Sequence, residues 1–279
     1  MSALSEKDLA SLAAAVSQLE HPSLAAKLAA AVGMPLEKLL TWLPPAIQKQ
    51  VDRVTEEALT RALNVAVKTL NDETVKAPWN LSHKVVATLS GVTGGLFGAP
   101  ALFAELPVTT VIIMRSIADI ARSKGENLSD PAVQLACLEV FALGSAGKQE
   151  AMNSGRDEAQ TGQESVRAAY FIARASMAQQ VTAAAEMLTK GTASGSGTAL
   201  TRLVSTIASR FGVAVSEKVA AQAVPIVGAI GGGLINALFM DHFQNTAEAH
   251  FCVRQLERAY GTESVQQEYE RIAAKSHVR

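Results

Sequence analysis

The chain has 279 residues, of which 48% are hydrophobic and only 5% aromatic, and its formal net charge at pH 7 is −1. A charge this close to balance supplies no basic patch for nucleic acid, so we expect no nucleic-acid partner. The two cysteines, Cys137 and Cys252, lie far apart in the sequence, which argues against a disulfide scaffold and fits a reducing compartment.

The first residues predict a helix rather than a targeting segment. Ser5 is a favourable N-cap, Asp8 complements the helix dipole, and apolar residues recur at helical spacing from Leu9 to Leu19. No basic region followed by an apolar run occurs here, so we expect no secretory signal.

Two further helices are predicted in the N-terminal part of the chain. The first follows Pro22, and the second is a longer and more charged helix over residues 47–70. The charges place this second helix at the periphery. We therefore predict that residues 1–75 form a helical cap and that residues 76–279 form the core.

The least charged part of the chain is rich in glycine. From Val85 to Met114 the only formally charged side chain is Glu105. Glycines and a proline interrupt the first half of this stretch, and we predict a helix over residues 102–123 after them. A second glycine-rich stretch, residues 225–236, lies nearer the C-terminus.

Glycines spaced three or four residues apart clear one face of a helix, so that another helix can approach its backbone closely. Each glycine costs a helix interior about 1 kcal/mol relative to alanine, so these segments are either closely packed helices or loops that break helices. The glycines concerned are Gly91, Gly94, Gly95, Gly98, Gly228, Gly231 and Gly232. Their spacing suits a soluble helical core and a membrane-related role alike, and both interpretations stay open.

Two uncharged stretches, Val85–Ala104 and Val219–Met240, approach the ~20 residues that a helix needs to cross a bilayer. Both are rich in Gly, Ala, Ser, Thr and Pro, and charged residues follow or bracket them directly. We therefore expect a cytoplasmic protein that is peripheral to the inner membrane rather than one that spans it.

Helical patterns account for the rest of the chain, and no long alternating pattern predicts a strand. The helix that Ser129 caps is apolar almost all round, and such a helix is buried. We predict helices over residues 129–141, 166–188, 199–211, 214–223, 234–260 and 264–275, with loops at 153–163 and 191–197. The fold class is therefore all-α: a single compact domain of about nine or ten helices with two tightly packed, glycine-rich segments at its centre.

Polar side chains line one face of the helix over residues 102–123. At 100° per residue this face holds Glu105, Thr109, Ile112, Ser116 and Asp119, with Arg115 and Arg122 beside it. The remaining faces are too apolar for a surface helix. We expect Glu105 and Asp119 to be largely buried, with at least one of them in contact with Arg115, Arg122 or His250. Such a stripe is either a paired buried network or the polar floor of a binding cleft. Pro107 is expected to start or kink this helix.

The long C-terminal helix carries Asn236 and His250 on one apolar stripe, a setting typical of a core histidine. The strongest metal set that the residues allow is Glu105, Asp119 and His250. No Glu-x-x-His or His-Glu-x-x-His motif occurs, so we expect no metal and no other cofactor.

Several spaced landmarks resemble the EcsC-like family, which is named for a member associated with an ABC transporter. The landmarks are the block from Gly91 to Gly98, Glu105-Leu106-Pro107, Arg115, Ile120-Ala121, Gly125, Pro225, Gly228, Gly231, Asn236, Phe239 and His250-Phe251. The resemblance covers roughly residues 78–260 and departs mildly at Glu105, where the family pattern has Asp. It implies a bacterial protein and brings no settled catalytic activity; the positions it singles out are Glu105, Pro107, Arg115, Asn236 and His250.

These observations favour a non-enzymatic protein at the cytoplasmic membrane. We expect it to assist a transporter, or to bind lipid or another apolar ligand in a groove between the glycine-rich helices. A hydrolase with a metal or acid/base site at Glu105, Asp119 and His250 is one alternative. An interaction scaffold that binds its partner through the first 70 residues is another.

Overall fold

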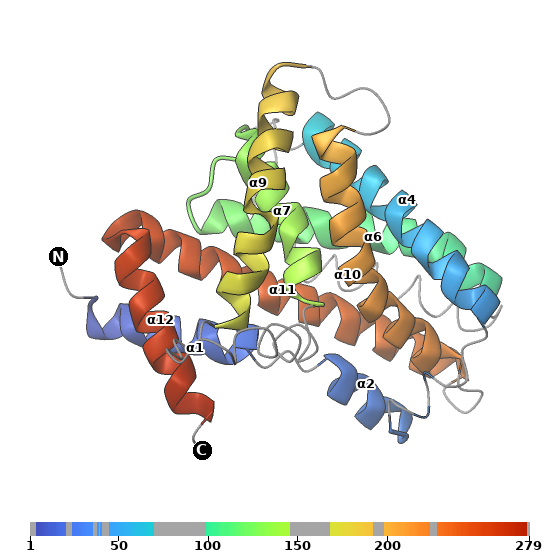
Figure 1. Cartoon of the computed structure of the whole chain (residues 1–279). Helices are drawn as coiled ribbons and strands as arrows, with labels where there is room; N and C mark the ends of the chain where they lie inside the picture. Colours follow the sequence, from blue (N-terminus) through green and yellow to red (C-terminus); the bar gives the residue numbers. More distant parts are fainter. Residues whose placement is uncertain are drawn as a thin grey trace, which may run out of the picture.

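The computed structural model describes residues 4–20, 24–35, 38, 40, 45–69, 99–145, 168–191, 198–223 and 228–277. Within these ranges the regular elements are nine α-helices, and there is no strand. Figure 1 shows how the helices cross one another in a compact arrangement. The predicted all-α class is confirmed.

Along the chain, the helices of the described ranges come in this order: α1 (Glu6–Glu20), α2 (Leu24–Val32), α4 (Pro45–Thr69), α6 (Ala99–Ser123), α7 (Pro131–Leu143), α9 (Ala169–Thr189), α10 (Ala199–Gln222), α11 (Gly228–Tyr260) and α12 (Thr262–His277).

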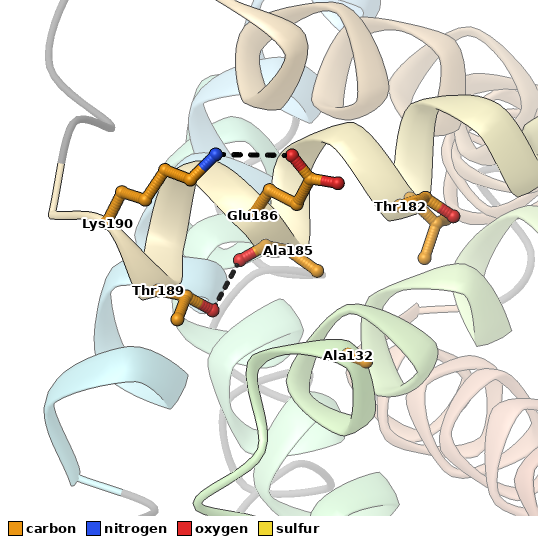
Figure 2. A pocket seen from close by; sticks show the side chains of 7 residues that line it. Ala132, Thr182, Ala185, Glu186, Thr189 and Lys190 are labelled. Carbon is orange, nitrogen blue, oxygen red and sulfur yellow. Dashed lines mark hydrogen bonds and ion pairs between the residues drawn. The ribbon is translucent and has the colours of Figure 1, made fainter.

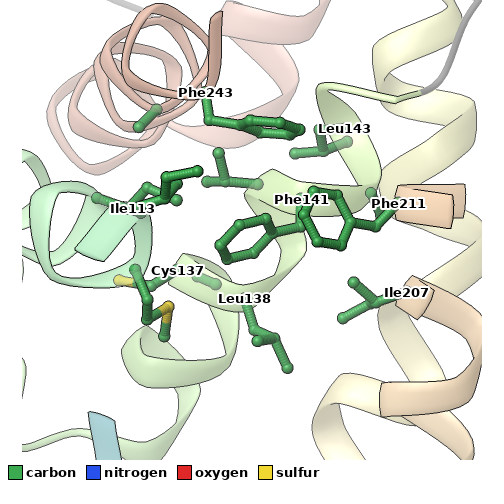
Figure 3. Close-up of a cluster of buried hydrophobic side chains, with 14 of the residues drawn as sticks. Ile113, Cys137, Leu138, Phe141, Leu143, Ile207, Phe211 and Phe243 are labelled. Atoms are coloured by element: carbon green, nitrogen blue, oxygen red, sulfur yellow. The ribbon is translucent and has the colours of Figure 1, made fainter. Parts of the chain in front are cut away.

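Helix α7 lies at the centre of the fold. Every residue from Val133 to Leu143 is buried, and the helix contacts α4, α6, α9, α10 and α11. Phe141 packs against Phe211 of α10 and Phe243 of α11, with ring centroids 4.8 and 5.4 Å apart (Figure 3). The prediction that this apolar helix is buried is therefore confirmed.

The N-cap of α7 differs from the predicted one by one residue. Asp130, not Ser129, is the N-cap: its side chain accepts a hydrogen bond from the backbone of Ala132, and Pro131 occupies the first helical position. A proline there loses no intrahelical bond and its fixed φ suits the first turn, so the Asp-Pro pair sets the boundary.

The N-terminal helices share the core with the rest of the chain. Helix α4 packs on α6 and α10, while α1 packs on α11 and α12. Leu12 of α1 and Leu59 of α4 are fully buried in the same apolar cluster as Phe141. A division of the chain near residue 75 stays a prediction.

Two helices are longer than the sequence patterns predicted. Helix α10 runs without a break through Gly212, where two helices were expected, and α11 begins at Gly228 instead of Leu234. Glycine lowers helix propensity by about 1 kcal/mol, which tertiary packing outweighs in both places. Pro107 likewise lies inside α6 and does not start it.

Helices α6 and α11 lie side by side and run in the same direction. Two side-chain contacts join them, Glu105 with Asn236 and Ser116 with Gln244, and Lys124, directly after α6, pairs with Glu248 in the same order. The two helices that follow or contain the glycine-rich stretches are thus neighbours.

Only some glycines of the two glycine-rich stretches lie within the described residues. Gly91, Gly94, Gly95 and Gly98 lie outside the described residues, whereas Gly228, Gly231 and Gly232 belong to the first turns of α11, where Gly232 is buried. Among the described helices, none is both long and apolar enough to cross a membrane.

Candidate functional site

A buried ion pair joins α6 to α10. The Nζ atom of Lys218 lies 3.1 Å from Oε1 of Glu105, and the two side chains are only 3% and 5% exposed. The same oxygen accepts hydrogen bonds from Nδ2 of Asn236 at 2.7 Å and from Oγ1 of Thr109 at 2.9 Å. One carboxylate oxygen therefore holds α6, α10 and α11 together.

The charge of Glu105 is compensated within this cluster. Burial raises the pKa of the carboxyl, but the charge of Lys218 and the hydrogen bonds from Asn236 and Thr109 outweigh burial and keep the pKa below its usual value. The Lys218 ammonium also lies over the ring of Phe239, 5.0 Å from its centroid. The glutamate is consequently ionised at neutral pH.

The second carboxylate oxygen of Glu105 differs sharply from the first. Oε2 is buried and has no hydrogen-bond partner within the described part of the chain. A buried polar atom without a partner is costly, and such atoms are few in native proteins. Glu105 therefore retains an unused acceptor next to a fully used one.

The sequence places these side chains by helical periodicity. Glu105 and Thr109 are one turn apart on α6 and so face the same way. Lys218 continues the buried stripe of α10 that runs through Phe211 and Val215. Sequence reasoning missed Lys218, although a lysine seven residues after a buried phenylalanine on an apolar stripe was a signal for it.

The other predicted members of the polar stripe on α6 lie elsewhere. Arg115 is exposed and takes no part in the cluster around Glu105. Asp119 is 12% exposed and pairs with Arg122 at 3.3 Å, so one of the expected carboxylate–arginine contacts is present. The partner of Glu105 is a lysine from another helix instead.

His250 belongs to a second polar cluster, between α9 and α11. Its Nδ1 atom lies 3.0 Å from the hydroxyl of Tyr170, which also accepts a hydrogen bond from Arg174 at 3.2 Å. Arginine can only donate, so the Tyr170 hydroxyl accepts the bond from Arg174, whereas the tautomer of His250 decides which atom donates between Tyr170 and Nδ1. Burial, followed by the charges of Arg174 and Arg254, holds the pKa of His250 well below its usual value.

Carboxylates balance the arginines of this second cluster. Arg174 binds Glu257 through both terminal nitrogens, at 2.8 and 3.2 Å, and Arg254 binds Glu126, which also pairs with Arg258. Glu139 of α7 is buried, and burial raises its pKa to about 7 although Arg174 and Arg254 lower it.

The two clusters are well separated along α11. Asn236 and His250 are fourteen residues apart, which is ~21 Å of helix at about 1.5 Å per residue. The same spacing separates Glu105 from Asp119 on α6. Glu105, Asp119 and His250 therefore do not meet in one site, and no group of three or more metal-ligating side chains occurs among the described residues.

The outer faces of α6 and α11 change character along their length. On α6, exposed Ala104 and Val108 precede Arg115, and Val108 is 53% exposed. On α11, Leu234 is 49% exposed and is followed on the same face by Asn245. Near the Glu105 cluster both helices thus present apolar side chains outward; we call this part of the surface the apolar end.

A hollow of about 330 Å³ lies between α7 and α9 (Figure 2). Ala132, Val181 and Ala185 supply apolar lining, and the pair Glu186–Lys190, 3.4 Å apart, borders it. None of its lining residues belongs to the Glu105 or the His250 cluster, so the hollow adds no chemistry to them.

A model of the EcsC protein family matches residues 6–256 of the chain. The matched region begins in α1, includes both polar clusters apart from Glu257 and Arg258, and ends before α12. No curated protein and no solved structure matches the chain.

Proposed function

Because this chain belongs to the EcsC protein family, we propose that it is a non-enzymatic accessory protein of the cytoplasmic membrane. It acts from the cytoplasmic side, as a peripheral protein that assists a transporter or holds a lipid or other apolar ligand. The apolar end, where α6 and α11 lie side by side, is the part that meets the lipid.

The observation that carries this proposal is the one-sided change in the outer faces of α6 and α11. Val108 and Leu234 are about half exposed, although leucine and valine are among the residues most often buried. Both lie on the halves of their helices that adjoin the uncharged glycine-rich stretches. Apolar surface of this kind on two neighbouring helices suits contact with a lipid surface.

The Glu105 cluster supports the same proposal from inside the protein. It ties α6, α10 and α11 together just beneath the apolar end. A rigid support of this kind presents the apolar side chains in a fixed arrangement, so that contact with lipid costs little ordering of the chain.

Flotation with liposomes tests the proposal. The purified full chain is mixed with vesicles of phosphatidylethanolamine and phosphatidylglycerol and centrifuged through a density gradient. We expect the protein to rise with the vesicles, and the double variant Val108→Asp, Leu234→Asp to stay at the bottom.

A matched control separates the apolar end from a general effect of charge. Asn245→Asp with Gln255→Glu adds the same charge to the outer face of α11, where both side chains are exposed. We expect this variant to float like the unchanged protein. A protein that stays wholly at the bottom of the gradient contradicts the membrane proposal.

For the hydrolase alternative, Glu105 binds Thr109 and Lys218, Asp119 pairs with Arg122 and His250 contacts Tyr170, so the three do not share one site among the described residues. Partner binding by the first 70 residues remains an expectation from sequence. Since α1 and α4 supply buried core residues, testing it requires surface substitutions, such as Glu57 and Arg61 on α4, rather than deletion.

A further inference from the structure

The hydrogen bonds to Glu105 are distributed unequally between its two carboxylate oxygens. Holding the helices together does not require this inequality. Oε1 receives three donors, at 2.7, 2.9 and 3.1 Å, while Oε2, on the same carbon, receives none from the described residues. The side chain is 5% exposed. A bare carboxylate oxygen in such a place calls for a donor from outside the chain.

Lys218 offers complementary groups beside this oxygen. Its ammonium carries three N–H donors, and Oε1 of Glu105 is its only hydrogen-bond acceptor among the described residues. Within the described part of the chain, an acceptor and donors without hydrogen-bond partners therefore lie in one ion pair. A ligand that fits both has a donor and an acceptor close together.

The charge balance of the pair restricts that ligand further. Glu105 and Lys218 neutralise each other, so a ligand with a net charge would bring an unpaired charge into a buried site, at a high desolvation cost. A fatty-acid carboxylate would also meet Glu105 with like charge. An uncharged head group with a hydroxyl and an ester carbonyl meets every requirement.

We propose that the Glu105–Lys218 pair is the polar anchor for the head group of an uncharged, hydroxyl-bearing glyceride lipid. The lipid hydroxyl donates to Oε2 of Glu105 and an ester carbonyl accepts from Lys218. This inference rests on the proposed function, because the apolar end is where the acyl chain leaves the anchor.

The test is a comparison of head groups on one acyl chain. Binding of monoolein, methyl oleate and oleate to the full chain is measured below their critical aggregation concentrations, by native mass spectrometry with calorimetry as a check. We expect monoolein to bind at least tenfold more tightly than methyl oleate, which has the ester but no hydroxyl, and more tightly than oleate, which is charged.

Substitutions assign the preference to the pair. Glu105→Gln with Lys218→Met removes both charges together and leaves neither unpaired, and it should reduce the preference for monoolein over methyl oleate to less than threefold. Arg115→Ala, on the same helix but exposed, should leave the tenfold preference unchanged. A purely structural pair would alter stability without altering this ratio.

The outcomes of these experiments distinguish the lipid anchor from the proposed membrane contact on which it rests. A protein that floats with liposomes but binds the three lipids equally, or prefers oleate, overturns the anchor and leaves membrane contact standing. A protein that neither floats nor binds any of them overturns both. Selectivity of the unchanged chain is informative even where the double variant does not fold.

Discussion

The two polar clusters on α11 solve the problem of buried charge in different ways. In the Glu105 cluster a single carboxylate forms an ion pair with a single ammonium group. Asn236 and Thr109 donate hydrogen bonds to the same carboxylate oxygen. Around His250 three arginines and three glutamates share charge, and the cluster reaches the surface through Arg258.

The difference shows where each cluster is vulnerable. The Glu105 pair has one partner for each charge, so the loss of either partner leaves a bare charge in the interior. In the His250 cluster Glu126 binds two arginines, and Glu139 can give up its charge by keeping a proton. The first cluster is therefore sensitive to substitution and the second to pH.

The largest effect is expected from Lys218→Met. This change leaves the Glu105 carboxylate buried and unpaired, and we expect it to lower the free energy of unfolding by about 3–5 kcal/mol. Adding Glu105→Gln should recover a large part of the loss, since no bare charge remains. Urea denaturation of the two singles and the double measures the coupling; strictly additive losses would mean that the two residues are not partners.

Glu139→Gln tests the pH sensitivity of the second cluster. The pKa of Glu139 is raised by burial from 4.5 to about 7, so the folded chain holds this proton more tightly than the unfolded chain does. Below pH 4.5 Glu139 is protonated in both the folded and the unfolded chain, so the free energy of unfolding does not change with pH through this group. From pH 4.5 to 7 the unchanged protein loses stability as pH rises, and above pH 7 the loss stays at about 3 kcal/mol.

Glutamine has no such proton to lose. The stability advantage of Glu139→Gln should therefore open between pH 4.5 and 7 and stay level above pH 7, which chemical denaturation across a pH series measures. An advantage that is the same at pH 4 and pH 8 would show that Glu139 does not titrate as the structure indicates.

The part of α11 between the two clusters depends on the absence of a side chain at Gly144. A Cβ there would lie 2.7 Å from Cε1 of Phe243, and the Gly144 carbonyl accepts a hydrogen bond from His242 at 2.6 Å. We expect Gly144→Ala to cost about 1–3 kcal/mol through overpacking.

Gly212→Ala is the matched control for that substitution. Its Cβ would meet no described heavy atom closer than Oδ1 of Asp52 at 3.8 Å, an ordinary contact inside α10. The alanine should stabilise the helix by about 1 kcal/mol. Thermal melts that move both variants in the same direction would contradict this assignment of the two glycines.

The smallest effect is expected from Arg115→Ala, a position that the family resemblance singled out. Arg115 is exposed and lies outside both clusters, so the free energy of unfolding should change by no more than about 0.5 kcal/mol. Calorimetry checks this value. A loss comparable to that of Lys218→Met would show that Arg115 supports the Glu105 cluster after all.

Periodicity within one helix explains which features were predictable. The burial of α7 follows from its apolar circumference, and the burial of Glu105 follows from the apolar faces around it. The partner of Glu105 did not follow, because Lys218 is 113 positions away and only tertiary packing brings it near. The exposure of Arg115 did not follow either, and for the same reason. A helical projection gives the angle of each side chain around its own helix, but it does not show which other helix packs against that face.

Glycine is where local reasoning was least reliable. Propensity alone would break α10 at Gly212 and delay α11 to Leu234, yet both helices continue because burial of their apolar faces outweighs about 1 kcal/mol per glycine. Helix length in a packed core is decided by such burial, which a single sequence shows only indirectly.

Hydrogen–deuterium exchange with and without liposomes tests the central claim most directly. If the apolar end meets the membrane, vesicles should slow amide exchange in peptides covering the first halves of α6 and α11, and leave α9 and α12 unchanged. Protection confined to α9 or α12, or no protection at saturating lipid, would contradict the account.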